Sequence, residues 1–312
     1  MKNRWHGFPS AVTYRKELSG MEEKDLDILE RIHAAYYQLT ATERKVADYV
    51  LAQHDQVQFM SITQLADECG TADATISRFC RSLQLKGFNA FKIELARHCA
   101  STASSKPQLQ SSDTLLGRCQ EIGRLANDAV QQTIELVDPA QVARAVDPAQ
   151  VARAVDLIEN AAHVMCIGSG GSMLLANTFA HMFSNVTGKF YAVSDAHMQI
   201  SAAATMSSQD IIVLFSYSGA TTGGLQILEL AKARGIRTIL VTRFHKSPAA
   251  KLADVVLRCG SNEGPFQFGS VPAKVAQLIV MDVLFQEYCH RNRESCEENI
   301  QSIASALSGM HV

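Results

Sequence analysis

Long apolar segments are absent from this sequence of 312 residues. No apolar run reaches the ~20 residues that a membrane-spanning helix needs. The first residues, Met-Lys-Asn-Arg-Trp-His-Gly-Phe, also lack the apolar centre of a signal peptide. We therefore expect a cytoplasmic protein that does not enter a membrane. Residues 1–21 show little periodicity and are expected to form a loose tail, with Met21 as a candidate true start.

A metal-binding arrangement of cysteines is also missing. None of the eight cysteines forms a C-x-x-C pair, and no histidine falls at zinc-finger spacing. Most of them lie within apolar patterns, as Cys166 does in Val-Met-Cys-Ile-Gly. This distribution predicts buried free thiols in a reducing compartment. We expect neither a metal site nor a cofactor.

The chain has no overall positive charge. Its net charge is −2, so any binding to nucleic acid must come from positive charge gathered in one region. Hydrophobic residues make up 47% and charged residues 19%, which is the balance of an ordinary globular protein. The length suffices for two domains of about 100–200 residues each.

The chain is expected to combine an all-helical domain with an α/β domain. Closely spaced helical patterns are followed by a Ser-rich linker and then by alternating strands and helices. This order predicts an α + α/β protein whose second domain is a doubly wound parallel sheet, with ligands at the carboxyl ends of the strands. The expected parts are a helix-turn-helix domain at 22–100, a linker at 101–113, connecting helices at 114–149, the α/β domain at 150–292, and a tail or helix at 293–312.

A short tandem repeat precedes the α/β domain. Residues 137–145 recur without change at 146–154. Their period is much shorter than the ~20–50 residues of structural repeats, which indicates a local duplication in the gene. Each copy contains Asp-Pro-Ala, a favourable helix start, and helices are therefore expected at Ala140–Ala145 and Ala149–Ala161.

Residues 61–83 have the pattern of a helix-turn-helix. Such a hairpin needs a small residue where the helices touch, a Gly in the turn, and a branched apolar residue facing back from the second helix. Ala66, Gly70 and Ile76 meet these requirements. The apolar seam is completed by Leu65, Cys69, Phe79 and Leu83.

Capping residues predict where the helices of this half begin. Helices are expected at 23–38 and 42–53, and the capping box Thr40-Ala-Thr-Glu43 opens the second. The candidate caps of the hairpin are Ser61 or Thr63 for its first helix and Thr71 or Asp73 for its second.

The second helix of the hairpin is expected to lie in the major groove of DNA with a polar face outward. Residues 74–98 hold five Lys or Arg against one acid, Glu94, while the preceding helices are acidic. The alternative is a helical hairpin with no role in DNA binding. The candidate DNA-binding residues here are Thr71 and the outward set Asp73, Thr75, Ser77, Arg78 and Arg81.

The segment after the hairpin adds a family resemblance. Ala-Asp-Tyr-Val-Leu at 47–51, the hairpin, and Leu-x-x-Lys-Gly-Phe-x-x-Phe-Lys at 83–92 together resemble the N-terminal domain of the RpiR family of bacterial transcription regulators. The resemblance covers about residues 25–100. It implies that Lys86 and Lys92 lie near the phosphates of double-stranded operator DNA, and that Phe88 and Phe91 belong to the core.

Two strand-turn-helix units in the second half are candidates for anion binding. In the first, the apolar strand from Val164 runs into a Gly/Ser turn that ends at Ser172, with a helix expected at Met173–Asn185. The turn is not a dinucleotide fingerprint, because Met173 stands where a third Gly is required. It is not a P-loop either, because no Gly-Lys-Ser/Thr follows.

The second unit carries the stronger prediction. A buried strand from Asp210 is followed by three hydroxyls, those of Ser216, Ser218 and Thr221, and by a helix expected at Gly224–Arg234. Several neutral donors beside a helix N-terminus suit a phosphate monoester. One hydroxyl is expected to cap the helix, but one cap does not account for three. We therefore expect an anion site in this loop.

The same motifs resemble the SIS (sugar isomerase) domain over about residues 150–290. They are Ser-x-Ser-Gly-x-Thr after a strand, Gly-x-Gly-x-Ser before it, and Asp-x-Val-Leu after it. The resemblance implies a phosphorylated sugar as ligand, and an SIS domain behind this hairpin is the arrangement of RpiR-type regulators. The residues implied to bind the phosphosugar are Ser169, Ser172, Ser216, Ser218, Gly219, Thr221 and Lys274.

A general base for isomerisation is missing where the resemblance would place it. In isomerising relatives a Glu precedes the Lys by seven residues, whereas Gln267 precedes Lys274 here. A Gln cannot take a proton from carbon at neutral pH. Glu263, His197 and His245 are weaker candidates, so no catalytic residue is assigned. We expect a transcription regulator, not an enzyme, whose operator affinity responds to the phosphosugar.

Two alternatives remain open at this point. One is a phosphosugar isomerase with an accessory helical domain, and the other is a regulator that binds a protein partner through that domain. A homodimer or homotetramer is expected, because two-fold proteins read paired half-sites. The apolar segment Val275–Tyr288 is a candidate interface helix or core helix.

Overall fold

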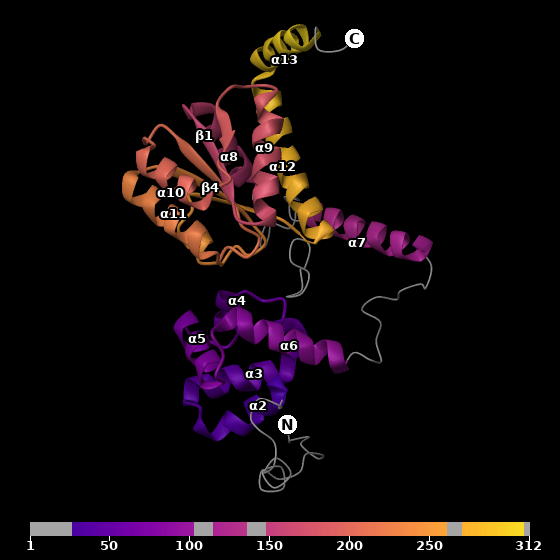
Figure 1. The fold of residues 1–312 in the computed structure, drawn as a ribbon, viewed down its shortest axis with the longest axis vertical. Helices are drawn as coiled ribbons and strands as arrows, with labels where there is room; N and C mark the ends of the chain where they lie inside the picture. Colours follow the sequence, from indigo (N-terminus) through magenta and orange to yellow (C-terminus); the bar gives the residue numbers. More distant parts are fainter. Residues whose placement is uncertain (1–26, 103–114, 136–147, 261–269, 309–312) are drawn as a thin grey trace. The chain divides into compact units, whose positions relative to one another are not determined.

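The computed structural model describes residues 27–102, 115–135, 148–260 and 270–308 (Figure 1). The described residues before 110 form one compact unit, and those after it form another. Their architecture confirms the predicted α + α/β class. No helix in these ranges combines the length and the apolarity needed to cross a membrane. The predicted helix at Ala140–Ala145 lies outside the described residues.

The N-terminal unit is built from helices alone, as its sequence pattern predicts. The predicted helix over 23–38 is an α-helix followed by a short 3-10 helix, and residues 23–26 lie outside the described ranges. The elements are α2 (Ile28–Ala35), η1 (Tyr36–Gln38), α3 (Ala41–Val57), α4 (Ile62–Glu68), α5 (Asp73–Ser82) and α6 (Phe88–Thr102). The prediction ended α3 too early, at residue 53: the helix continues to Val57 across a kink at Gln53, where φ is −134° and ψ is 30°.

Side chains cap three helix starts in this unit. Asp27 accepts hydrogen bonds from the backbone N–H groups of α2, which places the start at Ile28. The predicted Thr40–Glu43 capping box is confirmed at the start of α3. Of the two candidates for α4, Ser61 is the cap, in a second capping box with Gln64. These bonds satisfy N–H groups that have no partner within the helix.

Glu43 also joins α3 to the hairpin. Its side chain is buried and accepts hydrogen bonds from the Thr40 hydroxyl at 2.6 Å and from the Ser82 hydroxyl at 3.1 Å. Burial alone would raise the pKa of Glu43, but the hydrogen bonds from Thr40 and Ser82 hold it below the ordinary value. A carboxylate that accepts several hydrogen bonds can remain ionised within a core, so Glu43 fixes the end of α5 against the start of α3.

The C-terminal unit is a five-stranded sheet with helices on both faces. All strand pairs are parallel and the strand order is β2-β1-β3-β4-β5. The strands are β1 (Val164–Gly168), β2 (Phe190–Ala192), β3 (Ile211–Phe215), β4 (Arg237–Thr242) and β5 (Val255–Arg258). The helices are α7 (Leu115–Glu135), α8 (Pro148–Asn160), α9 (Gly171–Ser184), α10 (Ala196–Thr205), α11 (Thr222–Arg234), η3 (Ala249–Lys251), α12 (Val271–Arg291) and α13 (Arg293–Leu307).

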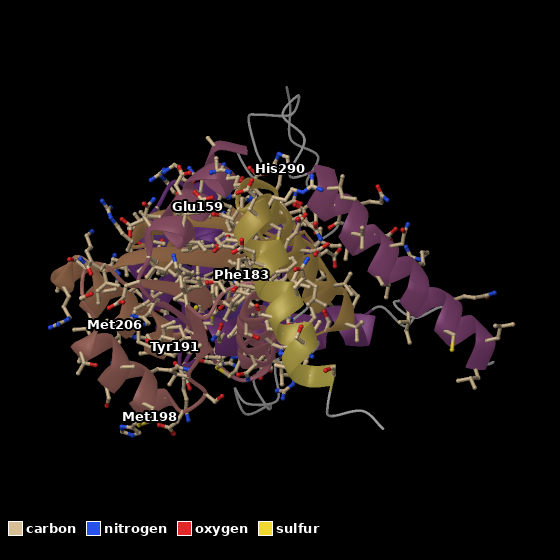
Figure 2. All side chains as sticks on the ribbon, turned by 90° about the horizontal axis from the view of Figure 1, so that it is seen from above. Glu159, Phe183, Tyr191, Met198, Met206 and His290 are labelled. Atoms are coloured by element: carbon tan, nitrogen blue, oxygen red, sulfur yellow. The ribbon has the colours of Figure 1, made fainter. Side chains whose placement is uncertain are left out.

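Two helical layers bury the two faces of this sheet. Helices α8, α9 and α12 share a core with one face, and α10 and α11 share a core with the other, as Figure 1 shows. In the first layer, Phe183, which is labelled in Figure 2, stacks on Phe190 with ring centroids 4.1 Å apart and contacts Tyr288 of α12. Layers on both faces explain why β1 and β3 are apolar throughout.

Several details of this unit differ from the sequence predictions. Helix α9 begins at Gly171 instead of Met173, and α11 begins at Thr222 instead of Gly224. Strand β2 was not predicted, because only Phe190 of its three residues is buried and the run is too short to show a pattern. The segment Val275–Tyr288 lies within α12, and its inward face belongs to the core.

Candidate functional site

The hairpin of α4 and α5 is positioned by its turn. Gly70 has a φ of +61°, a backbone conformation that strains other residues, and the Thr71 N–H donates to the Ala66 carbonyl at 2.8 Å. Ala66 and Ile76 are buried where the helices meet, as predicted. The prediction that Thr71 or Asp73 caps α5 is wrong, because the cap is Ala72 and it makes no side-chain bond. Asp73 instead accepts a hydrogen bond from Thr63 at 3.0 Å.

The outward face of α5 carries fewer of the predicted residues than expected. Arg78 and Arg81 are exposed and Ser77 is half-buried. Thr75 is 5% exposed, so the prediction that it faces outward is wrong. Thr75 directly precedes the buried Ile76, and its hydroxyl accepts a hydrogen bond from the Arg78 guanidinium at 3.3 Å. The side chains that this face presents to a partner are therefore those of Ser77, Arg78 and Arg81.

The segment after α5 adds two more lysines to the same unit. Lys86 is exposed in the connection to α6. Lys92 is half-buried in α6, where its Nζ lies 5.9 Å from the centre of the Phe88 ring. Phe91 is fully buried and packs edge-on against Phe79, whereas Phe88 is only partly buried against the core. Phe91 therefore belongs to the core, as the family resemblance implies, whereas Phe88 packs against the edge of that core.

One contact that supports this face was not predicted. The guanidinium of Arg31, on α2, donates a hydrogen bond to the carbonyl of Leu83 at the end of α5. The residues lie 52 positions apart in the sequence, and no local pattern signals such a pair. With Glu43 and Ser82, it fixes the C-terminal end of α5 to the rest of the unit.

The second candidate site lies at the carboxyl end of β3. Ser216 follows the strand and is buried, with its Oγ 3.5 Å from Oγ1 of Thr221. Ser218 is exposed, and its hydroxyl accepts a hydrogen bond from the Ala220 N–H at 3.3 Å. The prediction that one of these hydroxyls caps α11 is wrong, because the side chain of the N-cap residue, Thr221, accepts no hydrogen bond from the backbone of the helix. The N-terminus of α11 thus lacks a side-chain cap, and the loop that leads into it carries three hydroxyls.

Gly219 holds this loop against the segment that follows β4. It has a φ of +60°, and a Cβ there would lie 2.1 Å from Oγ of the buried Ser247. The Gly219 carbonyl accepts a hydrogen bond from the Ala249 N–H at 2.9 Å. Thr242 adds a hydrogen bond from its hydroxyl to the Tyr217 carbonyl at 3.0 Å. Thr242 and Ser247 were not predicted as part of this site, although the hydroxyl of Thr242 at the carboxyl end of β4 was a usable signal.

The loop after β1 lies beside the loop after β3. The register pairs Gly168 with Phe215, so Ser169 and Ser216 follow directly paired residues. Gly168 is required there, because a Cβ would lie 2.8 Å from the Ser172 backbone. Gln199, a buried residue that the sequence analysis missed, donates to the Gly168 carbonyl at 3.1 Å. Ser169 is exposed and Ser172 half-buried, so both stand at the edge of the sheet that carries Ser216.

The remaining candidate residues are less closely tied to these loops. Lys274 lies half-buried near the start of α12, and among the described residues no hydrogen bond joins its side chain to the serine loops. His197 and His245 are exposed. Gln267 and Glu263 lie outside the described residues.

Comparison with known proteins assigns both units. The model of the helix-turn-helix domain of the rpiR family matches residues 26–102, and the SIS domain model matches 157–286. The chain is 29% identical to an HTH-type transcriptional regulator of Caldanaerobacter subterraneus, covering 90% of this chain and 97% of that protein. It is 26% identical to the HTH-type transcriptional regulator HexR of Escherichia coli over 90% and 94%.

Solved structures agree with this assignment. The NanR protein of Vibrio vulnificus, solved in complex with ManNAc-6P, is 26% identical, with a TM-score of 0.81, and covers 92% of this chain and 100% of its own. The sugar isomerase domain of an RpiR transcription factor from Sphaerobacter thermophilus shares the fold of the C-terminal unit, with a TM-score of 0.52. The Caldanaerobacter and Escherichia coli relatives, which match over both units, are named as transcriptional regulators. The chain accordingly belongs to the RpiR family of transcription regulators, with a helix-turn-helix domain and an SIS domain.

Proposed function

We propose that this regulator binds operator DNA through α5 and that a phosphorylated sugar, bound at the carboxyl end of β3, controls its affinity for DNA. The observation that carries the effector site is the N-terminus of α11. It has no side-chain cap, and the loop that precedes it carries the hydroxyls of Ser216, Ser218 and Thr221. A helix N-terminus with several neutral donors binds a phosphate through its N–H groups and dipole.

The rest of the sugar site would come from neighbouring loops. Ser169 and Ser172 follow the adjacent strand, and Lys274 supplies a positive charge near the start of α12. Gly219 lets this loop lie against Ser247, because a Cβ at that position would collide with the Ser247 side chain. The complex of NanR with ManNAc-6P supports a phosphosugar as the class of ligand.

The DNA-binding proposal relies on the charge of the second hairpin helix and the segment after it. Arg78, Arg81 and Lys86 are exposed, whereas the opposite face of α5 is buried in the core. Exposed arginines near base edges and lysines near phosphates are the usual contacts of such a helix. Thr71, Asp73 and Lys92 are half-buried, so we propose for them a supporting role beside the contact residues.

Control of DNA binding by the sugar requires a link between two states. A ligand shifts an equilibrium only by its difference in affinity for the two states. We propose a homodimer or homotetramer in which the phosphosugar, by ordering the serine loops, favours one arrangement of the paired hairpins. The half-site spacing of the operator would report which arrangement binds DNA.

Thermal denaturation of the purified protein tests the effector site. We expect one phosphosugar to raise the melting temperature while its unphosphorylated parent sugar does not. Ser218→Tyr should abolish this shift and leave DNA affinity in the absence of sugar unchanged, because Ser218 is exposed and lies in the other unit. A wild-type protein that no phosphosugar stabilises would contradict the proposed effector site.

Fluorescence anisotropy with operator DNA tests the other half of the proposal. Affinity should fall steeply as salt rises, because phosphate contacts release counterions. A salt-independent affinity, or binding only to a protein partner, would contradict DNA recognition through α5.

A further inference from the structure

Helix α7 is held to the rest of its unit near one end. The helix packs against α12, and within it Ala129 and Thr133 are buried almost completely. Toward its N-terminus, by contrast, Leu115, Leu116 and Ile122 are each more than half exposed. Figure 1 shows this end extending beyond the helices that cover the sheet. The position of α7 is therefore set by the contacts around Thr133.

One of these contacts joins α7 to the segment directly after β5. The Gly260 N–H donates a hydrogen bond to Oγ1 of Thr133 at 3.0 Å, and that hydroxyl donates in turn to the Ala129 carbonyl at 2.7 Å. The two segments also touch closely, because a Cβ at Gly260 would lie 2.7 Å from the backbone nitrogen of Thr133. Gly260 and Thr133 are both buried. Since a buried N–H without an acceptor is costly, a shift of one residue is expected to carry the other with it.

Hydrogen bonds continue from this contact to the loop after β3. Cys259, which precedes Gly260, donates its N–H to the Thr242 carbonyl at 2.9 Å. The Thr242 hydroxyl donates to the carbonyl of Tyr217 at 3.0 Å, and Tyr217 lies within the proposed phosphate loop at 216–221. Thr242 and Cys259 are fully buried. The ends of β4 and β5 thus connect the phosphate loop to α7 through the protein interior.

We propose that this chain of hydrogen bonds transmits sugar binding from the loop after β3 to α7, and through α7 to the segment that leads to the DNA-binding unit. The inference rests on the proposed effector site and names the route of its regulation. Coupling between distant sites is carried by packed side chains and hydrogen bonds that have two arrangements. When a phosphate orders the loop, the Tyr217 carbonyl shifts with it, and the bonds of Thr242 and Gly260 pass the shift to Thr133.

The length of α7 enlarges a small shift at Thr133. The helix has 21 residues, and residues 115–133 span about 27 Å at 1.5 Å per residue. A tilt of about 5° at Thr133 therefore moves Leu115 by about 2 Å. Leu115 is the first described residue after 103–114, which precedes it in the chain and follows the helices of the N-terminal unit. Sugar binding can thus act on this connection without any contact between the sugar and α7.

Hydrogen exchange on the full-length protein tests the route, with glucose 6-phosphate, fructose 6-phosphate and ManNAc-6P as probes. We expect a probe that raises the melting temperature to slow exchange of the amides at 129–134 about fivefold. Thr133→Val keeps the shape of the side chain but removes the hydroxyl. It should reduce this slowing to less than about twofold, while the probe still raises the melting temperature.

Two further variants separate the hydroxyl from a general effect on the fold. Thr133→Ser keeps the hydroxyl and should restore the slowing at 129–134. Thr178→Val is the matched control on α9, because it removes a hydroxyl that also donates to the carbonyl four residues earlier, that of Leu174, at 2.8 Å. Thr178→Val should leave the slowing intact.

Fluorescence anisotropy measures the consequence for DNA binding, with an operator selected from random DNA by the wild-type protein. A saturating probe should change the DNA affinity of the wild type by about 5-fold to 150-fold. Thr133→Val should reduce this factor to less than about twofold. Its DNA affinity without the probe should stay within about twofold of the wild type, because Thr133 lies outside the DNA-binding unit.

Two results would overturn the route alone. One is a bound probe that leaves exchange at 129–134 unchanged, and the other is a Thr133→Val protein whose exchange and DNA affinity respond like the wild type. If no probe stabilises Thr133→Val or Thr133→Ser, Thr133 serves the fold or the sugar site, and the route is wrong. If no probe raises the melting temperature of the wild type, the proposed effector site itself fails, and the route fails with it.

Discussion

The two candidate sites are built in different ways. The proposed DNA-binding site is one continuous stretch of chain, in which α5 and its flanking residues provide both the buried seam and the exposed arginines. The proposed effector site collects loops after β1, β3 and β4, which lie far apart in the sequence and meet because parallel strands end at one edge. A continuous site can be recognised from its own pattern, whereas an assembled site depends on contacts between its loops.

Each candidate site contains a glycine with a positive φ, and substituting the one in the effector loop should have the largest effect on stability. Gly219→Ala should lower the free energy of unfolding of the C-terminal unit by about 2–5 kcal/mol, from a strained φ and a collision with Ser247. Urea denaturation measures the change. Combining it with Ser247→Gly should restore part of the loss, because the colliding atoms are then removed. Additive effects of the two substitutions would contradict the contact.

Gly70→Ala is the matched control in the hairpin. Gly70 has nearly the same φ, but nothing lies within 4 Å of an added Cβ. Only the backbone strain remains, so we expect a loss of about 1–2 kcal/mol in the N-terminal unit. A loss as large as that of Gly219→Ala would mean that the two turns are equally enclosed.

Glu43→Gln tests the contact that fixes the end of the hairpin. The folded protein holds the pKa of Glu43 below its ordinary value of 4.5. Its stabilisation is therefore present above that pH and is lost as the pH falls through the folded pKa. The substitution should cost about 1–2 kcal/mol at pH 7 and reduce the pH dependence of unfolding below 4.5. Glu94→Gln, which breaks an exposed pair with Arg97, should change neither.

Arg81→Ala tests the exposed face of α5 without disturbing its core. We expect DNA affinity to fall about tenfold and the slope of log affinity against log salt to decrease by about 1, with an unchanged melting temperature. Arg97→Ala on α6 is the control. Arg81→Ala should also leave the thermal shift by phosphosugar unchanged, and loss of that shift would show that the two sites do not bind independently.

Thr75→Val has the smallest expected effect. Thr75 is buried and its hydroxyl only accepts a bond from Arg78, so stability should change by less than about 1 kcal/mol. DNA affinity should stay within about twofold of the wild type. A tenfold loss of affinity would show that Thr75 turns outward to contact DNA.

The helix-turn-helix and the class of the second unit could be predicted from local patterns in the chain. Ala66, Gly70 and Ile76 are set by the packing and turn of two short helices, so their spacing is a local requirement that the chain displays directly. The apolar strands β1 and β3 could be predicted just as directly, because a strand that is buried on both faces needs a continuous run of apolar residues. The hydroxyls of Ser216, Ser218 and Thr221 could also be recognised from the sequence, because they follow a predicted strand within six residues.

Contacts between distant segments could not be predicted in this way, because they form only when the units fold. It turned Thr75 inward, directed Asp73 to Thr63 instead of the helix cap, and set Ser247 behind Gly219. It also brought Arg258 beside Thr242 and left its Nε without an acceptor. Each outcome depends on which side chains fill the space around a residue. That space is created when strands and helices pack, so it cannot be predicted from the pattern of a single segment.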